Sequence, residues 1–143
     1  MGMERNEDEA LKRIRLAAEE GVADAQLSLS AMYFTGRGVP RNEEEAARWC
    51  RLAAEQGVPS AQVHLGWMYL KGLGVARDER EGVEWIRRAA GQGHGGAQYS
   101  LGWLYYEGWG VPKDDQQAWR WAQLAASAGN EEGARLCALI GQV

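Results

Sequence analysis

Apolar and polar residues follow one another along this chain with the spacing of amphipathic helices. From residue 61 onward they predict a helix with two apolar stripes, one made of Ala61, Leu65, Met68 and Tyr69 and the other of Val63, Trp67 and Leu70. Two stripes predict that this first helix packs on more than one side. A glycine-containing loop follows, and then a second helix with a single apolar face around Trp85. The stretch therefore predicts a helix pair.

The helix-pair pattern occurs three times, because a shift of 36 residues superposes 61–96 on 25–60 and on 97–132. The residues that agree in all three stretches include Ala25, Ala61 and Ala97, Leu29, Leu65 and Leu101, Tyr33, Tyr69 and Tyr105, and Val39, Val75 and Val111. A fixed period in this range is typical of a stacked array in which each unit buries its apolar face against its neighbours. The sequence therefore predicts an all-α solenoid.

Polar residues and glycines mark where the predicted helices begin and end. Good N-cap residues open the second helices at Asn6, Asn42, Asp78 and Asp114. A Glu or Gln three positions later completes a capping-box pattern at Glu9, Glu45, Glu81 and Gln117. Because glycine readily adopts the left-handed C′ conformation, the second helices are expected to end near Gly21, Gly57, Gly93 and Gly129, and the first helices at Gly36, Gly72 and Gly108. Pro59 suits a first helical position, and Asn130 suits a cap.

These signals describe one solenoid over residues 1–143, with about eight helices. Residues 6–24 are predicted to form an N-terminal capping helix and residues 133–143 a C-terminal one, on either side of the repeats 25–60, 61–96 and 97–132. No second helix follows the last helix, which carries the apolar residues Leu136, Cys137, Leu139 and Ile140. This segment is expected either to cap the third repeat or to expose a stripe for weak homo-oligomerisation.

The repeated residues resemble the Sel-one-like repeat family, whose members are related to the tetratricopeptide repeats. The resemblance rests on the pattern A-Q-x-x-L-G-x-x-Y-x-x-G-x-G-V-x-x-D-x-x-x-x-x-x-W-x-x-x-A-A-x-x-G and covers about Asn6 to Ile140. It implies a right-handed superhelix of antiparallel helix pairs whose first helices line a concave groove. It also implies a non-catalytic adaptor, since members nucleate complexes in bacterial signalling and in eukaryotic protein quality control. Gly82 in place of the usual Ala is a mild departure, as is Asn42 in place of Asp.

Composition limits the kinds of partner and the cellular compartment that we expect for this chain. The net charge of -4 and the lack of a basic run argue against a nucleic-acid partner. No apolar stretch approaches the roughly 18 residues of a membrane-spanning helix, and the acidic N-terminal residues do not resemble a signal peptide. Cys50 and Cys137 are expected to be buried thiols, too far apart along a solenoid for a disulfide. A cytoplasmic location fits best, although a signal removed from a natural precursor is compatible with the sequence.

Catalytic, cofactor and metal sites are not indicated. His64 and His94 lack a second His or Cys at ligand spacing and are better explained as capping or turn residues. No Ser-His-Asp or Cys-His arrangement is present, and the pair Gly72-x-Gly74 punctuates a helix rather than cradling a phosphate. We therefore expect neither enzyme activity nor a cofactor or metal.

Candidate partner-binding residues lie on the predicted first helices. The aromatic candidates border the expected groove and are Trp67, Tyr99, Trp103 and Tyr106. They are expected either to fill the core between repeats or to present partly exposed anchors. The polar candidates are Gln26, Gln62, Gln98, Ser30 and His64. The repeated Gln is expected either to hydrogen-bond a partner's backbone or to bond an adjacent loop.

Two tryptophans, Trp109 and Trp119, break the repeat. Trp109 aligns with Arg37 and Leu73 in the loop. Because an arginine position is rarely buried, Trp109 is predicted to be a surface anchor, with folding over a neighbouring repeat as the alternative. The regularly spaced tryptophans are predicted to be core residues: Trp49, Trp85 and Trp121.

The function predicted from these features is that of a non-catalytic adaptor in a bacterial cytoplasm, which binds a peptide or protein surface in the concave groove. A preformed groove lowers the ordering cost of association, and aromatic anchors contribute affinity. Two alternatives remain open. One is a self-assembling structural protein, and the other is an inhibitor or regulator of a partner enzyme.

Overall fold

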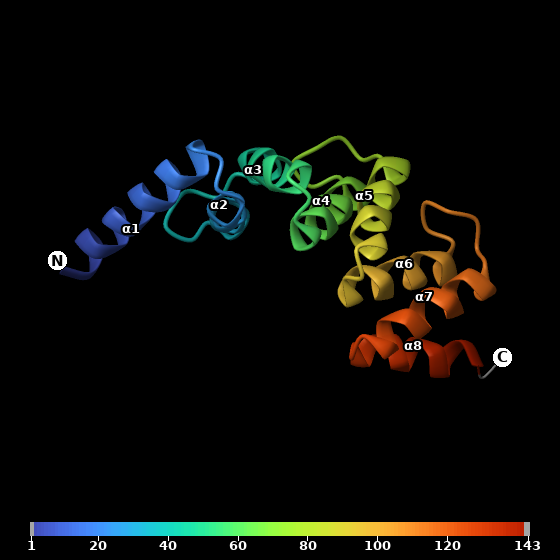
Figure 1. Cartoon of the computed structure of the whole chain (residues 1–143). Coiled ribbons are helices and arrows are strands. Elements are labelled where there is room, and N and C mark those ends of the chain that lie inside the picture. The colour runs from blue at the N-terminus through green and yellow to red at the C-terminus, as the bar shows by residue number, and fades with distance from the viewer. Residues whose placement is uncertain (1, 142–143) are drawn as a thin grey trace.

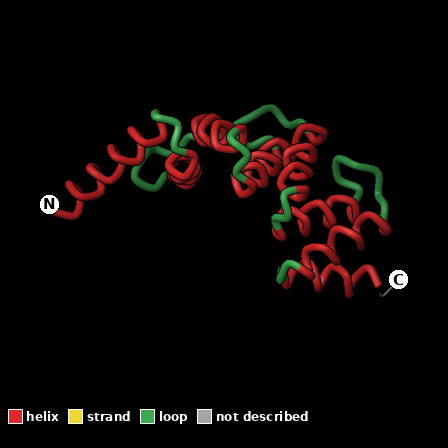
Figure 2. The backbone as a smooth tube through the Cα atoms, viewed as in Figure 1, coloured by secondary structure: helices red, strands yellow, loops and turns green. Residues whose placement is uncertain are grey.

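The computed structural model describes residues 2–141, which form eight helices and no strand (Figure 2). The helices are α1 (Gly2–Glu19), α2 (Ala23–Thr35), α3 (Glu43–Glu55), α4 (Pro59–Lys71), α5 (Glu79–Gly91), α6 (Gly95–Glu107), α7 (Asp115–Ser127) and α8 (Glu131–Gly141). They follow one another along an arc, with α2 and α4 on its inner side (Figure 1). Gln142 and Val143, the last residues of the predicted C-terminal capping helix, lie outside the described residues.

Each helix packs mainly against its neighbours in sequence. α2 pairs with α3, α4 with α5 and α6 with α7, and each pair packs on the next through the first helix that follows. Buried apolar residues join successive pairs, as in the cluster that contains Ala53, Leu65 and Trp85. The predicted all-α solenoid of antiparallel helix pairs is confirmed.

The N-caps predicted for α3, α5 and α7 are confirmed. Oδ1 of Asn42 accepts a hydrogen bond from the backbone N–H of Glu45 at 3.1 Å, and Asp78 and Asp114 make equivalent bonds. The backbone N–H of Asn42 donates to the Tyr33 carbonyl at 2.8 Å rather than to the Glu45 side chain that a capping box predicts. The same bond joins Asp78 to Tyr69 and Asp114 to Tyr105. Each loop is therefore closed onto the first helix before it.

The other helix ends match the prediction with one exception. Gly72 ends α4 in the left-handed conformation with φ of 70°, and Pro59 opens the same helix. Oδ1 of Asn130 accepts a hydrogen bond from the backbone N–H of Gly133 at 2.7 Å, as expected of a cap. The helix start predicted at Asn6 is wrong, because α1 already begins at Gly2. Residues 3–5 are Met, Glu and Arg, which have high helix propensity and extend the helix toward the N-terminus.

Two glycines bring α4 and α5 into close contact. A Cβ atom at Gly66 would lie 2.8 Å from the carbonyl oxygen of Gly82, and one at Gly82 would lie 2.6 Å from that of Gly66. In the preceding pair the counterpart of Gly66 is Ser30, whose hydroxyl donates to the Ala46 carbonyl at 2.6 Å. Small residues at these positions therefore allow the close approach of the two helices.

The apolar face of the second helices is narrower than predicted. Trp49 and Trp85 are buried, as expected, but Trp121 is half-buried. Leu52 and Leu124, which follow the tryptophans of their helices by one turn, are 37% and 50% exposed. Their counterpart on α5 is Arg88, whose guanidinium lies over the Trp85 ring at 4.5 Å from its centroid. The position is thus at the edge of the face, where a long side chain covers the core without entering it.

The two cysteines are both free thiols. Cys50 is buried and donates to the Ala61 carbonyl at 3.2 Å, and burial raises its pKa to about 11. Cys137 is only half-buried, contrary to the prediction, because no second helix follows α8 in the described residues to cover it.

Candidate partner-binding groove

An apolar groove lies between the first helices α2 and α4. α2 contributes Leu27, Ser30, Ala31, Phe34 and Thr35. α4 contributes His64, Trp67, Met68 and Lys71, and the loop after it contributes Leu73. The groove has a volume of about 320 Å³, at the small end of the range for ligand sites. It therefore fits one large side chain of a partner rather than a whole folded element.

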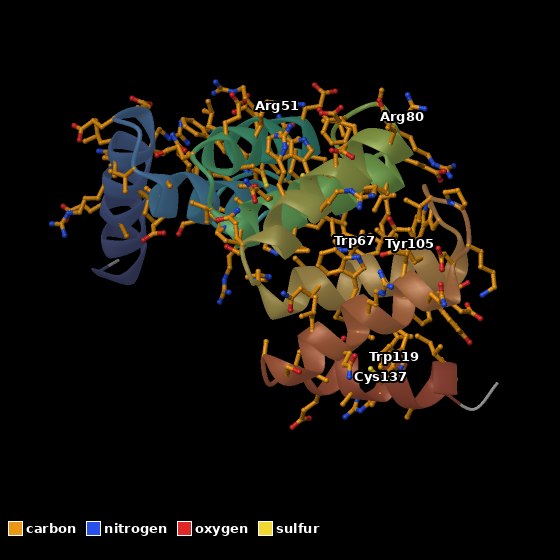
Figure 3. The ribbon with its side chains drawn as sticks, turned by 45° about the vertical axis from the view of Figure 1, so that its right-hand side comes forward. Arg51, Trp67, Arg80, Tyr105, Trp119 and Cys137 are labelled. Atoms are coloured by element: carbon orange, nitrogen blue, oxygen red, sulfur yellow. The ribbon has the colours of Figure 1, made fainter. Side chains whose placement is uncertain are left out.

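The groove exists because two positions of the repeat carry smaller side chains here. Ala31 and Leu73 stand where the next repeat has Trp67 and Trp109. In the next interval, between α4 and α6, the Trp67 and Trp109 rings meet edge to face with their centroids 5.5 Å apart. Both rings pack against the buried residues of α5 and α6, and Figure 3 shows Trp67 on the side of α4 that faces α6. Two indoles thus occupy the interval that follows the open one.

Two of the four polar side chains that line the groove already have hydrogen-bond partners. The Ser30 hydroxyl donates to Ala46, and the Thr35 hydroxyl donates to the Ala31 carbonyl at 2.9 Å. The Lys71 ammonium lies 5.6 Å from the centroid of the Trp67 ring. It forms no ion pair with any side chain from residue 8 to residue 141. Lys71 is therefore a cation at the groove wall that is available to a partner.

His64 lines this groove, as do the sequence candidates Ser30 and Trp67. His64 is exposed as a whole residue, but neighbouring groups surround part of its imidazole ring. This partial burial lowers the pKa of His64 below its ordinary value, and the nearby charge of His94 has the same effect. At neutral pH the ring is therefore an uncharged group that can donate or accept a hydrogen bond.

Trp109 is not the surface anchor that its alignment with Arg37 predicted. Its indole N–H donates to Oε2 of Glu79 at 2.8 Å, and its ring packs against Trp67. The loop lies so close to α5 that a Cβ atom at Gly110 would be 2.7 Å from Cγ2 of Val83. The alternative, a loop tryptophan folded over the neighbouring repeat, is the one observed. The contact ties the third repeat to the second.

The repeated glutamines do not face the groove, which corrects their place among the binding candidates. Gln26, Gln62 and Gln98 are buried, with 4%, 5% and 7% exposure. Their Nε2 atoms donate to carbonyls near the end of the preceding second helix, those of Ala18 (3.1 Å), Ala54 (3.2 Å) and Ala90 (3.4 Å). Each of these carbonyls also accepts a backbone hydrogen bond, from the N–H of Gly21, Gly57 or Gly93, so the amide is its second donor. The alternative of a structural amide is the one observed.

A second amide completes this arrangement in two of the three repeats. Nε2 of Gln56 donates to Oε1 of Gln26 at 2.9 Å, and Nε2 of Gln92 donates to Oε1 of Gln62 at 2.7 Å. The corresponding residue of the third repeat is Ala128, and Oε1 of Gln98 is buried without a hydrogen bond. The amides therefore form a ladder along the solenoid that lacks its last member.

The remaining aromatic candidates lie toward the C-terminal end of the array. Tyr99 and Trp103 line a second hollow of about 240 Å³ between α6 and α8, together with Glu132, Arg135, Leu136 and Leu139. The Tyr106 ring lies beside that of Trp103, with centroids 5.8 Å apart. The candidates are thus divided between two places. Trp119 lies away from both, 42% exposed on α7.

The arrangement has the character of a binding surface. Within residues 2–141, no group of three or more His, Cys, Asp or Glu side chains is placed to hold a metal ion. Over the same range, none of the helices combines the length and the apolar character needed to cross a membrane. An apolar groove with a few polar groups at its wall is suited to holding a partner's side chain.

Several groove residues were missed at the sequence level: Leu27, Ala31, Phe34, Lys71 and Leu73. The signal that could have found them is a comparison of one repeat position across the array. At two positions a tryptophan in one repeat is replaced by a smaller residue in another, as with Ala31 and Trp67. The sequence analysis looked for large aromatic residues as anchors. It therefore overlooked the small residues that leave the groove open.

Comparisons with known proteins agree on the family and the fold. The Sel1 repeat model matches residues 23–58, 59–94 and 96–130. The crystal structure of a Sel1 repeat protein from Oxalobacter formigenes is 44% identical, with a TM-score of 0.79 over 90% of this chain and 96% of that one. The protective antigen c5321 of uropathogenic Escherichia coli strains, which displays this fold, is 40% identical, with a TM-score of 0.83 over 86% of this chain and 26% of that one.

A more distant structure shares the fold alone. Helicobacter pylori cysteine rich protein B is 22% identical, with a TM-score of 0.71 over 93% of this chain and 96% of that one. A search of curated proteins found no match to this sequence.

Proposed function

Because this chain belongs to the Sel1 repeat family, whose members are generally protein-interaction scaffolds, we propose that it is a non-catalytic adaptor that binds a peptide or protein partner along the inner side of the array. The observation that carries the proposal is the open apolar groove between α2 and α4. The groove walls are the sides of two rigid helices, so a partner meets a preformed surface and the ordering cost of association is low.

A bacterial cytoplasm is the proposed location. The similar structures come from bacterial proteins, which supports the bacterial part of the proposal. The two free thiols support a reducing compartment, because secreted domains of this size commonly pair their cysteines.

Site-specific photo-crosslinking tests the adaptor function. A benzophenone amino acid placed at Thr35, which is exposed at the groove, is expected to capture a discrete protein from a bacterial lysate on irradiation. The matched control carries the same amino acid at Gln123, which is exposed on α7. An adduct formed from position 35 and absent from position 123 supports the proposal. Equal adducts from both positions, or none from either, contradict it.

A second candidate function is self-assembly through α8. The observation that favours it is Leu139, which is 43% exposed beside the hollow between α6 and α8. If α8 mediates assembly, the mass measured by light scattering rises with protein concentration and the rise disappears in the Leu139→Glu variant. A mass that stays monomeric at all concentrations removes this candidate.

A further inference from the structure

The open groove has a filled counterpart in the same molecule. Between α4 and α6, the indole of Trp109 packs edge to face on Trp67, and its N–H is bonded to Glu79. One repeat earlier, Leu73 takes the place of Trp109, and Ala31 takes the place of Trp67. The three helices around these intervals each have 13 residues, and each ends at a glycine in the left-handed conformation. An aromatic ring is therefore the group that would fill the groove between α2 and α4.

The walls of the groove suit an aromatic ring. Phe34 on α2 and Trp67 on α4 are both half-buried and line the groove from opposite sides. Aromatic rings in such a position gain from edge-to-face contact with an inserted ring, beyond the apolar area that they bury. Among the described residues, the Trp67 ring contacts one other aromatic ring, that of Trp109.

The charge at the groove differs from that of the chain as a whole. The chain carries a net charge of -4, yet the charged side chain that lines the groove is the cation Lys71. The counterpart of Lys71 in the next repeat is Glu107. Because the Lys71 ammonium has no ion pair among the described residues, a carboxylate on an incoming segment would meet a complementary charge there.

We infer that this groove accepts an aromatic side chain from a peptide segment of the partner, with an acidic residue of that segment placed beside Lys71. The inference rests on the proposed adaptor function and names the class of segment that it recognises. The ring occupies the space next to Ala31 and Leu73, between Phe34 and Trp67. Ring burial supplies most of the affinity, and the carboxylate selects among aromatic segments.

Filling the groove from within is the first arm of the test. The double variant Ala31→Trp with Leu73→Trp reproduces the residues found between α4 and α6. It is expected to fold, which circular dichroism and a melting curve check, and the single variant Leu73→Trp serves if the double one does not. In Leu73→Trp the new indole N–H also has an acceptor, because Oε2 of Glu43, the counterpart of Glu79, accepts no hydrogen bond.

The probe is a random twelve-residue peptide library displayed on phage, selected in parallel on the wild type and on the filled variant. Peptides enriched on the wild type alone are expected to share an aromatic residue with an Asp or Glu within two positions. Replacing that aromatic residue by Ala in a synthetic peptide is expected to weaken binding by at least about tenfold.

The charge arm uses Lys71→Glu, with Arg120→Glu on α7 as the control that changes net charge equally. Lys71→Glu is expected to weaken the acidic peptide about tenfold and to leave its Asn or Gln analogue nearly unaffected. Arg120→Glu is expected to change neither by more than about twofold.

The outcomes separate this inference from the proposed function. Enriched peptides that lack an aromatic residue, or that bind the filled variant equally well, overturn the inference, as does selection that enriches nothing on the wild type. The cross-linking result from position 35 is independent of peptide selection, so the adaptor function stands or fails on that result alone.

Discussion

At the scale of single residues, Trp109 shows how one side chain joins two repeats. Its indole reaches Glu79 on α5 and packs on Trp67 of α4. Replacing it with Leu, the residue that the second repeat has at this position, removes a hydrogen bond to a carboxylate and one ring contact. We expect Trp109→Leu to lower the free energy of unfolding by about 2 kcal/mol.

Urea unfolding followed by circular dichroism measures that effect. Trp119→Leu is the matched control, because this tryptophan is 42% exposed. The control is expected to cost less than about 0.5 kcal/mol. Equal losses in the two variants would mean that Trp109 does not tie the repeats together.

Because of His64, the free energy of unfolding is expected to depend on pH. Burial, and then the charge of His94, lower its pKa in the folded state below the ordinary value of the unfolded chain. The unfolded chain therefore binds the proton more readily, so the stability that neutral His64 provides is complete above the unfolded pKa and is lost as pH falls through the folded one. Between pH 7.5 and 5.5, the wild type is expected to lose more stability in urea titrations than His64→Gln. Parallel losses in the two proteins would show that His64 is not responsible.

The glutamines show what sequence reasoning could and could not establish about residues. The repetition of Gln62 in every repeat indicated that the residue has a role. The chemistry of its amide was compatible with binding a partner's backbone and with bonding an adjacent loop. The choice between them depended on the side-chain direction, which the first helix fixes by packing Gln62 against the end of α3. The periodicity also predicted that Trp85 is buried, because a core position repeats whichever partner the protein binds.

At the scale of elements, the amide ladder explains how each repeat is fastened to the one before it. In two repeats the Gln of the first helix is held by a second Gln at the end of the following helix. In the third repeat Ala128 supplies no donor, and the Gln98 bond to Ala90 is longer, at 3.4 Å, than the bonds of Gln26 and Gln62. The third repeat thus lacks the second amide, although Trp109 joins it to the second repeat.

Completing the ladder should stabilise the protein. Ala128→Gln places an amide donor near Oε1 of Gln98, which is buried without a partner. The expected gain is about 1 kcal/mol in the free energy of unfolding, the usual net value of one hydrogen bond. Ala128→Glu has nearly the same shape and no N–H to donate, so a gain of similar size in that variant would contradict the explanation.

Helix ends were the elements best predicted from sequence. Asn42 and Gly72 act locally, through bonds to the first turn and through backbone conformation, so their residue types carry the information. Asn6 is a good cap by type, but nothing in the residues before it stops the helix. The bond from Asn42 to Tyr33 was not predictable, because a backbone carbonyl carries no sequence signature.

At the scale of the whole molecule, stability is shared unequally along the array. Each helix pair contacts only its neighbours, so the central pairs are supported from two sides and the terminal helices from one. Hydrogen exchange measured by mass spectrometry is expected to show strongest protection in α3 to α6 and weakest in α1 and α8. Uniform protection along the chain would mean that the array unfolds as a single unit.

The repeat pattern could not predict the groove. Period and family fix what the repeats share, and these shared residues build the solenoid. The groove comes from what they do not share, the smaller Ala31 and Leu73 among larger counterparts. Sequence analysis therefore predicted the array and three of its groove residues, Ser30, His64 and Trp67, but placed the binding surface too broadly.

The filled interval between α4 and α6 also bears on how such proteins acquire new partners. Among the positions around these intervals, two exchange a small residue for a tryptophan: Ala31 and Leu73 at the open one correspond to Trp67 and Trp109 at the filled one. Neither position caps a helix or lies at the close crossing of Gly66 and Gly82, so substitutions there leave the scaffold intact. Selection can therefore open, close or move a binding slot along an array, while the helices that frame it are inherited unchanged.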